Sequence, residues 1–116
     1  MAEVVLTKQR IEDGKTERLI EWMSEVRERE DEVVETFRSE GMLTETAFLE
    51  RTDDGDYLVY FMEAQDFDDV YEAYDDSTHD IDEEHKKVLE EVLKDGDSPG
   101  VESYELLYHM TSPDRS

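Results

Sequence analysis

Two histidines and two tyrosines are the residues of this chain best suited to acid–base chemistry: His79, His85, Tyr60 and Tyr108. An imidazole exchanges protons near neutral pH, and efficient general acids and bases have pKa values near the working pH. A phenol adds a hydrogen-bond donor. These four side chains are therefore the candidates for proton donor and acceptor at a ligand site.

Two cationic residues extend this candidate set. Lys8 and Arg10 lie two positions apart in a strand-like segment, so both project from the same strand face. They would pair with Glu45 or Glu50 from another strand, which is the default, or would meet an anionic ligand. Arg10 and Glu45 complete the six residues that we expect at a ligand site.

Both helix-borne histidines also have structural explanations. His85 lies four residues after Ile81 and three before Val88, beside an expected apolar stripe, and this position favours a structural, hydrogen-bonded histidine. His79 precedes an expected helix start, where it could bind an anion or cap the turn. The two histidines are six residues apart, about 600° of helical rotation, so they would lie on different faces. We expect no metal site.

The strongest compositional signal is charge. Thirty-five acidic residues against twelve lysines and arginines give a formal charge of −23. The acidic residues alternate with apolar ones along the whole chain, as expected for a solvated surface and not for an acidic tail. Our hypothesis is adaptation to a salt-rich cytoplasm, where salt screens the self-repulsion. Such a field disfavours contact with nucleic-acid phosphates or anionic membranes, so we expect neither as a partner.

Length and residue usage limit the remaining classes. A chain of 116 residues suits a single domain, which we place at 1–110, with a flexible C-terminal tail at 111–116. The absence of cysteine excludes disulfides and thiolate metal ligands. The N-terminal residues lack the pattern of a signal peptide, and no apolar run approaches a membrane span. We expect a cytoplasmic protein.

Apolar periodicity predicts the secondary structure. Residues 27–32 interrupt the stripe of the first helix. The helix could bend there or turn polar groups toward a partner, but we favour a solvated face. Asp66 and Asp80 are the expected N-caps of later helices. An Asp-Gly pair predicts a hairpin. The predicted order is a strand at 4–11, a helix from 15 to the stop at Gly41, strands at 42–52 and 57–64, helices from 66 and from 80, a loop at 95–100 and a strand at 101–110.

This order predicts an α+β fold of the ferredoxin-like β-α-β-β-α-β type, with the second crossover split in two. The strand at 57–64 is apolar on both faces and should lie inside a four-stranded antiparallel sheet, with the helices on one face. The opposite face would then need another layer. We expect a homodimer that pairs two sheets as a dimeric α/β barrel.

The element order resembles the dimeric α/β-barrel superfamily, which includes antibiotic-biosynthesis-type monooxygenases, haem-degrading monooxygenases and sugar mutarotases. Three segments resemble an uncharacterised family of small proteins from salt-loving archaea: VVLTKQRIEDGKTERLIEWM, ETAFLERTDDGDYLVYFMEA and STHDIDEEHKKVL. The superfamily resemblance implies a cavity that binds small organic molecules. Haem-degrading members use an asparagine, a tryptophan and a histidine, but this chain has no asparagine, and its only tryptophan, Trp22, lies on an apolar helix face.

Two functional hypotheses follow. In the first, a halophilic dimeric barrel binds a small organic molecule, with or without transforming it, and uses no prosthetic group or other cofactor. In the second, the protein is a non-enzymatic dimeric regulatory or interaction module whose polar residues complete the interface. A polar cavity open to solvent would favour the first, and a filled interface the second. A DNA-mimicking inhibitor is a third possibility, which would need carboxylates at phosphate spacing.

Overall fold

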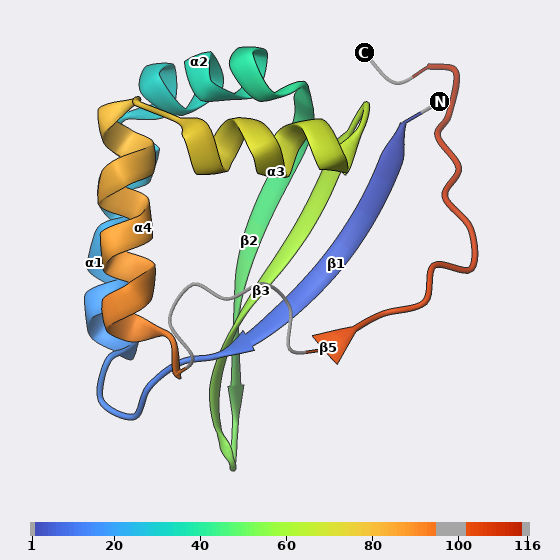
Figure 1. Ribbon diagram of the computed structural model, residues 1–116. Coiled ribbons are helices and arrows are strands. Elements are labelled where there is room, and N and C mark those ends of the chain that lie inside the picture. The colour runs from blue at the N-terminus through green and yellow to red at the C-terminus, as the bar shows by residue number, and fades with distance from the viewer. Residues whose placement is uncertain (1, 95–101, 115–116) are drawn as a thin grey trace.

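The computed structural model describes residues 2–94 and 102–114 (Figure 1). Within these residues the chain forms three long strands, four helices and one two-residue strand. The elements are β1 Glu3–Arg10, α1 Thr16–Glu28, α2 Glu30–Glu40, β2 Met42–Thr52, β3 Gly55–Ala64, α3 Phe67–Asp76, α4 Asp80–Val92 and β5 Glu102–Ser103.

The sheet is antiparallel, with the strand order β2-β3-β1-β5. β1 runs beside β3, so Thr7 lies opposite Tyr60 and Val5 opposite Met62. The expected hairpin is present as β2 and β3. Gly55, at the turn of this hairpin, has a φ of +139°, a conformation that side chains other than glycine rarely adopt. The strand with two apolar faces, β3, lies between β2 and β1, as its sequence indicated.

The predicted four-stranded ferredoxin-like β-α-β-β-α-β arrangement is wrong. Each crossover contains two helices, and the segment expected as a strand at 101–110 contributes only Glu102–Ser103, which pairs with two residues of β1. Residues 104–110 are not strand, and their large apolar side chains are exposed. Alternation specifies the two faces of a strand, but a strand also needs a partner for its backbone groups. The expected loop at 95–100 lies outside the described residues.

A helix break at Arg29 forms the corner of the helical layer. α1 ends one residue before Arg29 and α2 begins one residue after it, so the bend, one of the alternatives for 27–32, is present. Most of these residues are also exposed, as the favoured interpretation of a solvated face predicts. The Arg29 guanidinium lies 2.8 Å from Glu25 and 2.7 Å from Glu32, and it reaches Glu84 of α4 at 2.6 Å. These carboxylates raise the pKa of Arg29 further above its ordinary value. The corner is therefore tied to the last helix.

The other helix starts differ in how they are capped. Asp66 accepts hydrogen bonds from the backbone N–H groups of Asp68 and Asp69, so it caps α3 as expected. The expected cap at Asp80 is wrong, because this residue is already helical and His79 occupies the N-cap position without a side-chain bond. None of the helices in the described part of the chain is long and apolar enough to cross a bilayer.

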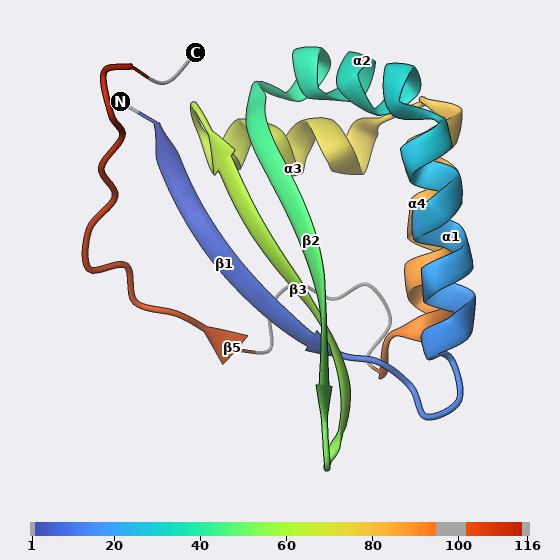
Figure 2. The same cartoon turned by 180° about the vertical axis from the view of Figure 1, so that it is seen from behind.

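The helices cover one face of the sheet as two pairs, and the two pairs run in different directions and meet at a corner (Figures 1 and 2). α1 packs against α4, and α2 packs against α3. Each pair contributes to its own buried cluster. The larger cluster centres on Ile11, Leu19, Trp22 and Val92, and the smaller one consists of Met42, Ala64, Phe67 and Val70. The corner between the pairs is the position of the cavity described below.

The outer face of the sheet carries apolar side chains that the helices do not cover. Phe48 is 55% exposed, and Leu6 is also exposed. Val59 and Phe61 lie opposite these residues in the register and are partly exposed. The expected homodimer would bury this face, and it stays a prediction.

Candidate functional site

A cavity of about 1120 Å³ lies between the inner face of the sheet and the two helix pairs. Its walls are mainly apolar and come from β1, β2, β3 and all four helices. Ile20, Val34, Leu49 and Tyr71 line the cavity and are also exposed, so they mark where it meets solvent. These positions lie on α1, α2, β2 and α3, and they place the opening beside the edge strand β2.

Strand register decides which sheet residues face this cavity. Leu58, Tyr60 and Met62 alternate along β3 and share its inner face. Glu45 of β2 lies opposite Met62, so its side chain belongs to the same face. Thr7 of β1 lies opposite Tyr60 and also lines the cavity. The sheet thus supplies one phenol and one carboxylate to the cavity wall, together with the uncharged polar residues Thr7, Gln9 and Thr46.

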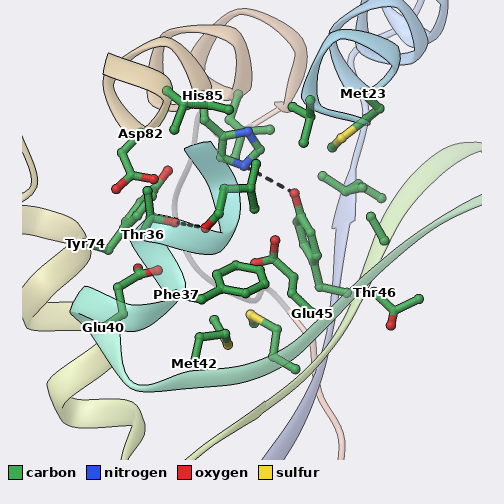
Figure 3. Close-up of a pocket in the computed structure, with 18 of the residues that line it drawn as sticks. Met23, Thr36, Phe37, Glu40, Met42, Glu45, Thr46, Tyr74, Asp82 and His85 are labelled. Atoms are coloured by element: carbon green, nitrogen blue, oxygen red, sulfur yellow. Dashed lines mark hydrogen bonds between the residues drawn. The ribbon is translucent and has the colours of Figure 1, made fainter. Parts of the chain in front are cut away.

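A chain of hydrogen bonds fixes the phenol. The indole N–H of Trp22 donates to Nδ1 of His85 at 2.8 Å. An indole can only donate, so Nδ1 bears no proton and the proton of the neutral imidazole lies on Nε2. Nε2 is 3.2 Å from the Tyr60 hydroxyl oxygen, and the dashed line from His85 in Figure 3 marks this hydrogen bond. With this tautomer, Nε2 donates and the Tyr60 oxygen accepts. Trp22 of α1 therefore sets the tautomer of His85 on α4, and His85 in turn orients Tyr60 on β3.

Burial keeps this chain uncharged. It lowers the pKa of His85 to about 4, so the imidazole is neutral at pH 7. Burial, with smaller contributions from Glu45 and Tyr74, raises the pKa of Tyr60 well above its ordinary value. Because Tyr60 uses its oxygen as the acceptor for His85, its own O–H proton remains to be donated. No residue in the described part of the chain accepts that proton.

Three carboxylates form an acidic corner of the same cavity: Glu40, Glu45 and Asp82. Burial, and then the charges of Asp82 and Glu45, raise the pKa of Glu40 to about 7. Burial and the charge of Asp82 raise the pKa of Glu45 to about 7. Solvent reaches Glu45 inside the cavity, although protein atoms surround it. Ser77 donates a hydrogen bond of 2.6 Å to Asp82.

The acidic corner does not have the geometry of a metal centre. Across residues 2–94 and 102–114, no group of three histidine or acidic side chains has the geometry to hold a metal ion. Figure 3 shows Glu40, Glu45 and Asp82 on different elements around the cavity. The arrangement can instead hold a proton or a cationic ligand group, since two of its members ionise near neutral pH.

The structure brings together three of the six predicted site residues. Tyr60, His85 and Glu45 line the cavity. Arg10 lies on the outer sheet face, 3.2 Å from Asp13. The remaining two also lie outside the cavity: His79 Nε2 is 3.4 Å from the Ser39 hydroxyl, and Tyr108 is 72% exposed. Lys8 follows its default expectation, because it pairs with Glu50 at 2.8 Å.

Sequence reasoning missed three residues of the site. Trp22 was assigned only to the apolar face of its helix, although a buried indole N–H usually finds an acceptor and a nearby histidine is a suitable one. Asp82 is buried, but it lies beside Ile81 and not on the apolar stripe itself, so periodicity did not select it. Glu40 is the last residue of α2, and nothing in its local sequence distinguishes it from the exposed acids of that helix.

Comparison with known proteins identifies the family but adds no activity. No curated protein matches the chain at a significant level. One family model matches nearly the full length, from residue 2 to residue 115. The chain therefore belongs to the family of unknown function DUF6176.

Proposed function

We propose that this protein binds a small organic molecule in the cavity between the sheet and the helices, with the Tyr60 hydroxyl as the polar anchor. The observation that carries the proposal is the buried Tyr60 hydroxyl, which His85 orients and whose remaining proton has no acceptor among the described residues. Small-molecule sites are typically apolar cavities of roughly 300–1,000 Å³ with a few well-placed polar groups. The cavity has this character. A module that only completes an interface would not need it.

The lining suggests the chemistry of the ligand. Met23, Val26, Leu58 and Met62 offer hydrocarbon and thioether surface for an apolar body. Tyr60 offers one hydrogen-bond donor, which suits a carbonyl, ether or hydroxyl oxygen. A buried donor left without a partner costs about 1–3 kcal/mol, so a ligand that supplies the acceptor gains over one that does not.

The experiment compares two ligands of similar size that differ by a carbonyl group. Acetophenone and ethylbenzene are titrated separately into the protein, and the methyl resonances of the cavity methionines Met23 and Met62 are followed by NMR. Acetophenone should bind several-fold more tightly than ethylbenzene. Tyr60→Phe should remove that preference, and Tyr104→Phe, at an exposed position in the C-terminal segment, should retain it. Equal affinities in the wild-type protein, or methyl resonances that neither compound shifts, would contradict the proposal.

A specific observation favours acid–base catalysis as a second candidate function. The pKa of Glu45, about 7, is near the value at which a carboxylate serves best as a general base in neutral solution. Glu45 could remove the proton next to a ligand carbonyl, whose oxygen would take up the negative charge while accepting a hydrogen bond from Tyr60. A deuteron from the solvent would then add to the same carbon, so deuterium would replace the removed proton. Protein-dependent exchange of the acetophenone methyl protons in D₂O, absent in Glu45→Gln, would support this candidate, and exchange at the buffer rate would exclude it.

A further inference from the structure

The acidic corner suggests the charge of the ligand. We infer that the ligand carries a protonated amine, which binds among Glu40, Glu45 and Asp82 while an oxygen of the same molecule accepts the hydrogen bond from Tyr60. This inference rests on the proposed function, because it concerns the ligand of the same cavity. It adds the substrate class: an amine with an apolar body and a nearby oxygen.

The three carboxylates converge from separate elements. Glu40 ends α2, Glu45 belongs to β2 and Asp82 lies in the first turn of α4. Each of the two glutamates is affected by the charge of Asp82, and Glu40 also by that of Glu45, so the three groups share one electrostatic environment. Like charges near one another in a partly desolvated site oppose ionisation. A cation placed among them would relieve this repulsion.

The protein supplies little positive charge to this corner. Lys86 is the cation that acts on Glu40, but its ammonium group donates to the backbone oxygens of Tyr74 at 2.6 Å and Asp75 at 3.4 Å. Among the described residues that line the cavity, Arg27 is the sole lysine or arginine. Arg27 is exposed and donates to Ser24 of its own helix. Within residues 2–94 and 102–114, the acidic corner therefore has no direct counter-ion, although Ser77 donates a hydrogen bond to Asp82.

Tyr60 is an independent indication that a ligand belongs here. Its side chain is 8% exposed, it lines the same cavity, and its hydroxyl proton has no acceptor in residues 2–94 and 102–114. The Tyr60 O–H needs a hydrogen-bond acceptor, and the acidic corner needs a cation. An amine that also carries an oxygen supplies both groups on one molecule.

The field of the whole chain favours the same charge. With a net charge of −23, the protein attracts cations and repels anions at long range. In molar salt the Debye length falls to about 3 Å, so this attraction disappears while direct contact inside the cavity persists. A preference for amines that survives molar salt would therefore report on the acidic corner and not on the general surface.

The experiment uses three probes with one apolar body and different head groups: 2-phenylethylamine, 2-phenylethanol and 3-phenylpropanoate. Affinities are measured in about 2 M KCl by NMR titration of the cavity methyl groups, where the screening length is below about 3 Å. The amine should bind at least ten-fold more tightly than the alcohol, and the anion should bind least. Glu45→Gln and Asp82→Asn should each weaken amine binding several-fold and leave alcohol binding within about two-fold.

A matched control removes one negative charge elsewhere. Glu72→Gln changes an exposed carboxylate on α3 and should leave the preference for the amine intact. If the alcohol binds in the cavity as tightly as the amine, the amine inference is wrong and the proposed function stands. If none of the three probes shifts the cavity resonances, both fail. If Glu72→Gln weakens amine binding as much as Glu45→Gln does, the preference comes from overall charge and the inference is overturned.

Discussion

The indole nitrogen of Trp22 lies 2.8 Å from Nδ1 of His85, although the two residues are 63 positions apart in the sequence. This bond joins α1 to α4 and leaves the imidazole with one tautomer. The tautomer decides which way the hydrogen bond to Tyr60 runs. The orientation of the Tyr60 hydroxyl proton therefore depends on Trp22, which lies on an apolar helix face.

Trp22→Phe should raise the pKa of His85 modestly above about 4, because the variant loses the indole N–H, which stabilises only the neutral imidazole, while the burial that lowers this pKa remains. The variant should also lose at least about 1 kcal/mol of unfolding free energy. NMR titration of the histidine side chains gives the pKa. An unchanged His85 titration would show that the indole does not set its protonation.

Glu45→Gln should stabilise the protein at pH 8 and have little effect at pH 4.5. The folded-state pKa of Glu45, about 7, is above the ordinary value of 4.5, so folding favours its protonated form. Below pH 4.5 Glu45 is protonated in both the folded and the unfolded state, so it does not change the unfolding free energy. Above pH 7 it is ionised in both states, and the cost of ionising it in the folded state lowers the unfolding free energy by its full amount. We expect a gain of about 1 kcal/mol at pH 8, since water in the cavity screens part of the effect. Chemical denaturation at the two pH values measures it, and equal gains at both would contradict the assignment.

Low salt should destabilise the fold. A net charge of −23 on 116 residues repels itself, and the repulsion weakens as the Debye length falls from about 10 Å at 0.1 M to about 3 Å at 1 M salt. The unfolding temperature, followed by far-ultraviolet circular dichroism, should rise steadily between these KCl concentrations. A protein equally stable at both ends of the series would refute adaptation to a salt-rich cytoplasm, which stays a prediction.

The outer sheet face should mediate the expected homodimer. Phe48 is 55% exposed there, next to other apolar residues of β1 and β3. Sedimentation velocity in concentrated KCl should find a dimer for the wild-type chain and for Phe48→Leu, but a monomer for Phe48→Asp, because a charge at this position opposes burial. Circular dichroism checks that both variants are folded. If the wild-type protein is a folded monomer at all concentrations, the predicted homodimer is wrong.

Local signals predicted the elements better than their assembly. The Asp-Gly turn and its flanking apolar runs predicted the β2–β3 hairpin. The interrupted stripe at 27–32 marked the position of the break at Arg29, although a bend there was only an alternative to the favoured solvated face. Local signals did not show that the predicted fourth strand would be absent from 104–110. The exposed segment 104–110 has the alternation of a strand, but pairing depends on a partner edge that the local sequence does not contain.

The candidate site shows the same division. Side-chain chemistry selected Tyr60 and His85, Glu45 was selected as a possible strand partner of Lys8 and Arg10, and the fold brings Tyr60, His85 and Glu45 to one cavity. Arg10 was selected because it shares a strand face with Lys8, and it lies on the opposite face of the sheet, because the register places it across from Tyr57 and not from Leu58. Alternation separates the two faces of a strand without showing which one the helices cover. Trp22 was missed because its hydrogen bond depends on the packing of α1 against α4.

The most direct test of the account is the structure of the protein crystallised in high salt with acetophenone. The compound should lie inside the cavity, with its carbonyl oxygen within hydrogen-bonding distance of the Tyr60 hydroxyl and the Trp22–His85 hydrogen bond intact. Acetophenone bound only on the outer face of the sheet, or a cavity that side chains have closed, would contradict it.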